Sequence, residues 1–130
     1  MNIGIVGCGN ISETYFECQK IFNNFNIIAC ADINKEAASN AASKYNVKAL
    51  SVDEILENKE IDLIINLTIP AAHKEIITKS LFNGKHCFSE KPLAMNFTEG
   101  IEIEKLANEK DLYVGCAPDT FLGAAGQKAR

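Results

Sequence analysis

The sequence has no excess of basic residues and no long apolar run. Its 13 lysines and arginines stand against 17 acidic residues, which gives a formal net charge of −4 and a pI near 5.2. A chain of this charge lacks the basic surface that nucleic-acid partners require. The apolar stretch 61–69 is interrupted by Asp62 and Asn66 and is far shorter than the ~20 residues of a membrane span. We therefore expect a soluble protein that binds neither nucleic acid nor membrane.

The sequence also lacks paired cysteines and a basic leader. Its cysteines are odd in number, contain no CxxC pair, and lie at Cys8, Cys18, Cys30, Cys87 and Cys116. This pattern fits neither a disulfide framework nor a zinc site, so we expect reduced, mostly structural thiols and no metal. Met1 leads directly into an apolar run without a secretory signal, which predicts a cytoplasmic protein. Homo-oligomerisation stays open.

Apolar runs alternate with segments of helical periodicity along the whole chain. At 130 residues and 47% hydrophobic content, the chain can enclose one core. The runs predict strands at 2–6, 26–31, 47–50, 62–67, 85–89 and 113–116. Such alternation predicts an α/β fold, a doubly wound and mainly parallel Rossmann sheet of about six strands with helices on both faces.

Polar residues mark where the helices between these strands begin. Asn34 can cap the second helix, Ser51 and Glu54 form a capping box, and Asn96 with Glu99 gives another cap signal. Pro70 suits a first helical turn, and Gly84 ends that helix. For the first helix, spacings of three and four residues predict an inward face made by Ile11, Tyr15, Cys18 and Phe22.

A glycine turn joins the first strand to the first helix. Gly7 permits a tight turn, Gly9 lets the backbone approach a pyrophosphate, and the helix beginning near Asn10 offers unpaired amides. Ser12 replaces the glycine or alanine that usually follows, which predicts a mildly altered pyrophosphate geometry. The turn predicts an anion site, although glycines alone could serve only to shape a turn.

Asp32 ends the second strand 20 residues after Ser12, close to the spacing at which a carboxylate reaches the adenosine ribose. A carboxylate accepts hydrogen bonds from ribose hydroxyls and repels a 2′-phosphate, and neither Ile33 nor Asn34 is an arginine that would offset it. These residues favour NAD over NADP, while Lys35 weakens the preference. S-adenosylmethionine-dependent methyltransferases share the glycine turn and the acid, and on these features they remain an alternative.

The loops after the fourth and fifth strands carry the most specific residues. They contain Thr68, Pro70 and His73, and then Glu90-Lys91-Pro92 after a Gly-Lys-His sequence. With the turn 7–12, Asp32 and the closing segment 115–123, these motifs resemble the N-terminal domain of the Gfo/Idh/MocA family of sugar and polyol oxidoreductases over essentially all 130 residues. Methyltransferases have no comparable Glu-Lys-Pro triplet, so the resemblance favours an oxidoreductase over a methyltransferase.

The resemblance implies that Lys91 lies beside the nicotinamide and the reacting carbinol, with Glu90 and Pro92 fixing its loop. It implies cofactor contacts for His73 as well, although a histidine near a helix start often only bonds backbone. His86, within the fifth strand, is expected to be structural. The full set of expected cofactor contacts is Gly7, Gly9, Asn10, Ile11, Ser12, Asp32, Thr68, Pro70, His73, Glu90 and Lys91.

The resemblance further implies a second domain that holds the substrate. We expect residues 1–118 to form the dinucleotide-binding domain and 119–130 to begin a connection to that missing domain. The expected function is hydride transfer between NAD, or less favourably NADP, and a sugar or polyol carbinol, with negligible turnover by this chain alone. The alternatives are a noncatalytic dinucleotide sensor or regulator of the same family, and an enzyme that recycles its cofactor in place.

Overall fold

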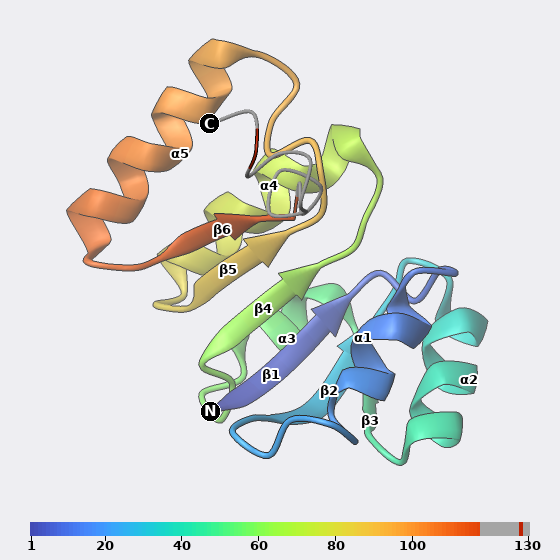
Figure 1. Cartoon of the computed structure of the whole chain (residues 1–130). Helices are drawn as coiled ribbons and strands as arrows, with labels where there is room; N and C mark the ends of the chain where they lie inside the picture. The colour runs from blue at the N-terminus through green and yellow to red at the C-terminus, as the bar shows by residue number, and fades with distance from the viewer. Residues whose placement is uncertain (118–127, 129–130) are drawn as a thin grey trace.

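The computed structural model describes residues 1–117 and 128 and has strands and helices in strict alternation (Figure 1). The expectations for 119–130 and for the end of the 115–123 motif lie largely outside these residues. The elements are β1 (Asn2–Val6), α1 (Ser12–Cys18), β2 (Asn26–Ala31), α2 (Lys35–Tyr45), β3 (Lys48–Leu50), α3 (Val52–Glu57), β4 (Leu63–Asn66), α4 (Pro70–Phe82), β5 (His86–Ser89), α5 (Phe97–Lys110) and β6 (Val114–Cys116).

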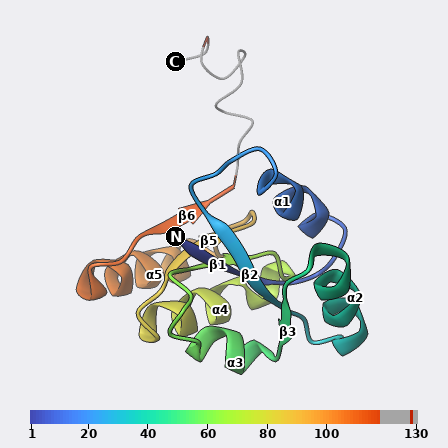
Figure 2. The same cartoon turned by 90° about the horizontal axis from the view of Figure 1, so that it is seen from below.

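All six strands are parallel and lie in the order β3-β2-β1-β4-β5-β6. Helices α1 and α2 lie on one side of the sheet, and α3, α4 and α5 lie on the other (Figure 2). Each side has its own buried cluster, because alternate residues of a strand point to opposite faces: Ile5 and Ile65 pack toward α1 and α2, whereas Ile64 packs toward α3 and α4. The predicted doubly wound Rossmann sheet is confirmed.

Strand positions follow the sequence pattern closely. The first two strands have the predicted bounds, and each of the other four begins one residue later than predicted. Two of these delays have a clear cause: the amides of Val47 and Lys85 bond to the carbonyls of Ala42 and Ser80, so both residues still belong to helix ends. Among the described helices, none is long and apolar enough to cross a membrane.

The predicted inward face of α1 is wrong in part. The helix ends at Cys18. The side chains of Ile11 and Phe22 are 45% and 52% exposed, whereas the buried residues of the helix are Ser12 and Phe16. Phe16 stacks on Tyr45 of α2, with ring centroids 4.2 Å apart. A helix of seven residues makes fewer than two turns, so helical spacing extended beyond Cys18 had no helix to describe.

Candidate dinucleotide site at the carboxyl edge of the sheet

The strand order reverses direction between β1 and β4, which are neighbours in the middle of the sheet. The chain leaves β1 toward α1 on one face and leaves β4 toward α4 on the other. Loops that diverge in this way leave a crevice beyond the carboxyl ends of the strands, where ligands of doubly wound sheets bind. The residues expected to contact a dinucleotide follow β1, β2, β4 and β5 at this edge.

Gly7 holds the first turn against the end of β4. Its φ of +102° is unfavourable for a residue with a side chain, and a Cβ there would lie 2.6 Å from the carbonyl oxygen of Leu67. The amide of Gly7 donates to the Ala31 carbonyl at 2.8 Å, and the amide of Leu67 donates to the Val6 carbonyl at 2.7 Å. Gly7 is therefore required by the fold.

Gly9 has the opposite surroundings. A Cβ built on Gly9 would meet no atom within 4 Å, so the space beside this residue is open. The carbonyl of Gly9 accepts hydrogen bonds from the amide and hydroxyl of Ser12, at 3.0 and 2.7 Å. The buried hydroxyl of Ser12 is therefore satisfied inside the turn, while Asn10 and Ile11 are exposed on its outside.

Helix starts divide into two kinds. Asn34 caps α2 by accepting from two amides, Ser51 and Glu54 form a complete capping box on α3, and the Asn96 side chain accepts from the Glu99 amide on α5. In contrast, the N-cap positions of α1 and α4 are occupied by Ile11 and Ile69, and neither helix has a side-chain cap. The two uncapped helices are those that follow β1 and β4 at the crevice. Amides at such starts suit an anionic ligand.

Asp32 lies directly after β2 and is half-buried. Its Oδ2 accepts from the backbone N–H of Cys8 at 2.7 Å, and its Oδ1 accepts from the backbone N–H of Asn34 at 2.8 Å. These two bonds fix the carboxylate beside the glycine turn. Each oxygen can still accept a second hydrogen bond, which suits recognition of neighbouring hydroxyls. A hollow of about 440 Å³ begins at Asp32 and continues along Leu50 and Val52.

Cys8, in the middle of the glycine turn, is half-buried, and its thiol donates to the Ala31 carbonyl at 3.5 Å. Its neighbour Cys30, with which it shares a hydrogen bond, and its burial raise the pKa of the Cys8 thiol well above the ordinary value. The thiol is therefore protonated near neutral pH, and protonated thiols react poorly. All five cysteines are free, in agreement with the expectation of unpaired thiols.

The loop after β4 is organised by Asn66, which is completely buried. Its Oδ1 accepts from the hydroxyl of Thr68 at 2.7 Å and from the amide of Thr68 at 3.2 Å, and its Nδ2 donates to the carbonyl of His73 at 3.2 Å. Pro70 is exposed at the first position of α4, as expected. The side chain of Thr68 is thus directed into its own loop.

His73 joins this loop to the one after β5. The ring is fully buried, with Nδ1 2.6 Å from the Pro92 carbonyl oxygen and Nε2 2.9 Å from the Thr68 carbonyl oxygen. Because both nitrogens face backbone carbonyls, His73 acts as a link between loops and presents no free atom to a ligand. The sequence left loop setting and cofactor contact open for this residue, and the geometry favours loop setting.

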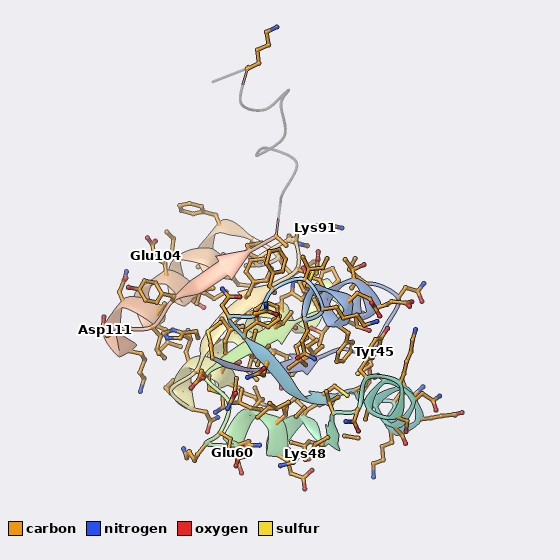
Figure 3. The ribbon with its side chains drawn as sticks, turned by 60° about the horizontal axis from the view of Figure 1, so that its bottom comes forward. Tyr45, Lys48, Glu60, Lys91, Glu104 and Asp111 are labelled. Atoms are coloured by element: carbon orange, nitrogen blue, oxygen red, sulfur yellow. The ribbon has the colours of Figure 1, made fainter. Side chains whose placement is uncertain are left out.

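Glu90 and Lys91 follow β5. The amide of Glu90 donates to the Asn66 carbonyl at 2.9 Å, its Oε1 accepts from the Tyr15 hydroxyl at 2.8 Å, and its Oε2 accepts from the Lys91 amide at 3.2 Å. Lys91 is exposed, and its peptide bond to Pro92 is cis. Figure 3 shows Lys91 on the side of the molecule opposite Lys48 and Glu60, which begin β3 and precede β4. The side chain of Lys91 therefore lies at the edge of the sheet formed by the carboxyl ends of the strands.

Two residues of this arrangement were not assigned a role from the sequence. Asn66 was recognised only as a polar interruption of an apolar run, although a buried amide at the end of a strand is itself a signal for a hydrogen-bonded loop. Tyr15 was placed on an inward helix face. Its contact with Glu90 joins residues 75 positions apart, which no local pattern reveals.

Known proteins resemble this chain in both sequence and structure. Residues 1–117 match the Gfo/Idh/MocA model, described as an oxidoreductase family with an NAD-binding Rossmann fold. An inositol 2-dehydrogenase of Serratia proteamaculans is 27% identical over 99 residues, which are 73% of this chain and 29% of that enzyme. A 2,7-anhydro-N-acetylneuraminate hydratase of Escherichia coli is 28% identical over 110 residues, which are 84% of this chain and 29% of that protein.

Among solved structures, a biliverdin reductase of Synechocystis in complex with biliverdin and NADP+ superimposes with a TM-score of 0.89 at 26% identity, covering 97% of this chain and 40% of that one. This chain therefore spans less than half the length of these relatives. Both nicotinamide dinucleotides occur among them, since the family description names NAD and the reductase structure contains NADP+. Because the family match covers residues 1–117, the chain belongs to the Gfo/Idh/MocA oxidoreductase family and is a nicotinamide-dinucleotide-binding Rossmann domain.

Proposed function

We propose that this chain binds NAD across the crevice between β1 and β4, as the cofactor domain of an enzyme that transfers hydride between nicotinamide and a sugar or polyol carbinol. The observation that carries the proposal is the pair of uncapped helix starts at α1 and α4, on either side of a glycine turn whose second glycine leaves open space. The room beside Gly9 and the exposed residues Asn10 and Ile11 in the same turn suit a pyrophosphate.

The remaining contacts follow from the order of the loops. Asp32 would hold the adenosine ribose, and the hollow between Asp32 and Val52 has room for the adenine. The loops containing Thr68 and Glu90 would border the nicotinamide. His73 would support them from within the protein, because its buried ring nitrogens face the backbone carbonyls of Pro92 and Thr68.

Lys91 is the proposed catalytic residue. A bound nicotinamide supplies hydride chemistry, and oxidation of a carbinol also requires a group that stabilises the developing alkoxide or moves its proton. A lysine ammonium can do either. Glu90 keeps the backbone at Lys91 in place through its bond to the Lys91 amide. The match to this chain covers 29% of the inositol 2-dehydrogenase, and we propose that residues 1–130 by themselves bind the dinucleotide with negligible turnover.

NAD is the proposed cofactor because Asp32 is fixed by two backbone amides and cannot turn away from a 2′-phosphate without losing them. Titration of the chain with NADH and NADPH, followed by nicotinamide fluorescence or heat, should show tighter binding of NADH. Asp32→Ala should reduce the difference between the two dinucleotides. Equal or reversed affinities in the unchanged chain would overturn the assignment of NAD.

The role of Lys91 is tested in the full-length protein with its substrate. Lys91→Ala should abolish most turnover and should weaken NADH binding by no more than about tenfold, because Lys91 is exposed and outside the proposed pyrophosphate contacts. An alanine variant with normal kcat would remove Lys91 from the mechanism.

A second candidate function is favoured by the hydratase among the relatives. In that case the protein that contains this domain would catalyse a reaction with no net oxidation of the substrate. Its tightly held cofactor would be reduced and reoxidised within one active site. The two candidates are distinguished by following absorbance at 340 nm during a single complete reaction of the parent protein. A dehydrogenase accumulates reduced dinucleotide in proportion to product, whereas a recycling enzyme does not.

A further inference from the structure

Tyr15 connects the helix of the glycine turn to the loop that contains Lys91. It lies on α1, and its hydroxyl donates to Oε1 of Glu90 at 2.8 Å. Its ring lies beside Phe88 of β5, with centroids 6.4 Å apart. The contact therefore crosses the crevice, from the segment that follows β1 to the segment that follows β5.

Glu90 is in turn tightly constrained. Its amide donates to the Asn66 carbonyl, and its second carboxylate oxygen accepts from the amide of Lys91. One carboxylate thus holds both the Tyr15 hydroxyl and the backbone of Lys91. Hydrogen bonds to an ionised carboxylate are shorter and stronger than those between neutral groups. With the hydroxyl removed, Oε1 would lose this donor, and the side chain could rotate and release the Lys91 amide.

We propose that Tyr15 is a positioning residue that sets the orientation of Lys91 through Glu90 and so couples the pyrophosphate end of the site to its nicotinamide end. The inference rests on the proposed function, because it requires the nicotinamide to lie beside Lys91. In this proposal Tyr15 acts on Lys91 through Glu90, to which its hydroxyl donates, and not on the ligand directly. Its effect should therefore be confined to the nicotinamide half of the ligand.

Two ligands separate the halves of the site. NADH carries the nicotinamide, whereas ADP-ribose has the adenosine, the pyrophosphate and the second ribose without it. Tyr15→Phe keeps the ring on Phe88 and removes only the hydroxyl. We expect this variant to bind NADH three- to tenfold more weakly and ADP-ribose within twofold of the original chain. The fluorescence maximum of bound NADH should also move toward that of free NADH.

Tyr113→Phe is the matched control, because it removes the same atom from a ring that is 80% exposed and lies just before β6. It should leave both affinities unchanged. In a double-mutant cycle, Tyr15→Phe should have no further effect on the NADH to ADP-ribose ratio once Glu90→Ala is present, because both changes break one connection.

The outcomes separate this inference from the function on which it rests. If the original chain binds neither ligand, both are overturned. If the original chain binds both ligands and Tyr15→Phe lowers the affinities for NADH and ADP-ribose equally, Tyr15 has a general structural role. In that case only the inference is wrong. The inference alone is also overturned if Tyr15→Phe changes neither affinity, or if its effect persists in full on the Glu90→Ala background.

Discussion

Two groups of helices in this molecule begin differently. Helices α2, α3 and α5 start at Asn34, Ser51 and Asn96, each of which accepts hydrogen bonds from first-turn amides. Helices α1 and α4 start at isoleucines that cannot do so. A missing cap costs on the order of 1 kcal/mol. Among the described helices, only the two that follow the strands bordering the crevice lack a side-chain cap, and a ligand there could take the place of the caps.

The comparison indicates that a helix start in this molecule serves either local stability or ligand binding, and that each helix does one of the two. Capped starts satisfy their own amides and need no partner. Uncapped starts are stabilised by other means: the glycine turn is bonded to β2 through Gly7, and the start of α4 is fixed by Asn66 and His73. The same division should therefore appear in how each start responds to substitution.

The largest effect is expected at Gly7. Gly7→Ala would place a Cβ 2.6 Å from the carbonyl oxygen of Leu67 at a φ of +102°, so the turn or β4 must shift. We expect a loss of at least about 3 kcal/mol in the free energy of unfolding, together with loss of NADH binding. Urea unfolding and NADH titration of the same preparation measure both quantities.

Gly9→Ala is the control for this substitution. Its Cβ would meet nothing within 4 Å, so the free energy of unfolding should change by less than about 1 kcal/mol while NADH binding weakens through obstruction of the open space. Equal effects of the two alanines on stability would show that the turn does not distinguish a residue required by the fold from one required by the ligand.

Much of the fold could be predicted because its signals are local. The caps at Asn34, Ser51 and Asn96 depend on residues two or three positions away, and all three are present as predicted. The bounds of β1 and β2 follow from short apolar runs ended by Gly7 and Asp32. The face of α1 could not be predicted, because the helix is too short for its periodicity to define one.

The hydrogen-bond partners of the candidate site residues could not be predicted from the sequence. Spacing indicates Asp32, and the family resemblance indicates His73 and Glu90, but their partners lie far along the chain. Asp32 bonds to Cys8, 24 positions away, and His73 bonds to Pro92, 19 positions away. Whether a polar side chain faces a ligand or the protein's own backbone depends on such tertiary contacts. His73 shows the difference most clearly, since its pattern suggested a ligand contact and its nitrogens face carbonyls.

A smaller effect is expected from the same substitution at the two kinds of helix start. Asn10→Asp adds one negative charge at the uncapped turn and should weaken NADH about tenfold, because like charges near a protein surface repel at this scale over several Å. Asn96→Asp adds the same charge at a capped start, where aspartate is an equally good cap, and should change neither affinity nor stability. The penalty at position 10 should shrink as salt rises from 50 to 500 mM. A penalty that is equal at both positions would refute the distinction.

The smallest effect concerns acid and the capping box of α3. Hydrogen bonds from Ser51 lower the pKa of Glu54, so protonation of this carboxyl is harder in the folded chain than in the unfolded one. The stabilisation it provides is therefore fully present above the unfolded pKa, about 4.3 for a glutamate, and is lost as the pH falls through the lower folded value. Glu54→Gln keeps an oxygen that can accept from the Ser51 amide but cannot titrate.

The difference in unfolding free energy between Glu54→Gln and the original chain should therefore shrink as the pH falls from 6 to 3, as measured by urea unfolding. Glu57→Gln, a change on the same helix outside the capping box, controls for the loss of one negative charge. A constant difference across this range would mean that the cap on α3 does not depend on the ionised carboxylate. The expected acid sensitivity is specific to the start of α3, because α2 and α5 are capped by the neutral side chains of Asn34 and Asn96, which do not titrate.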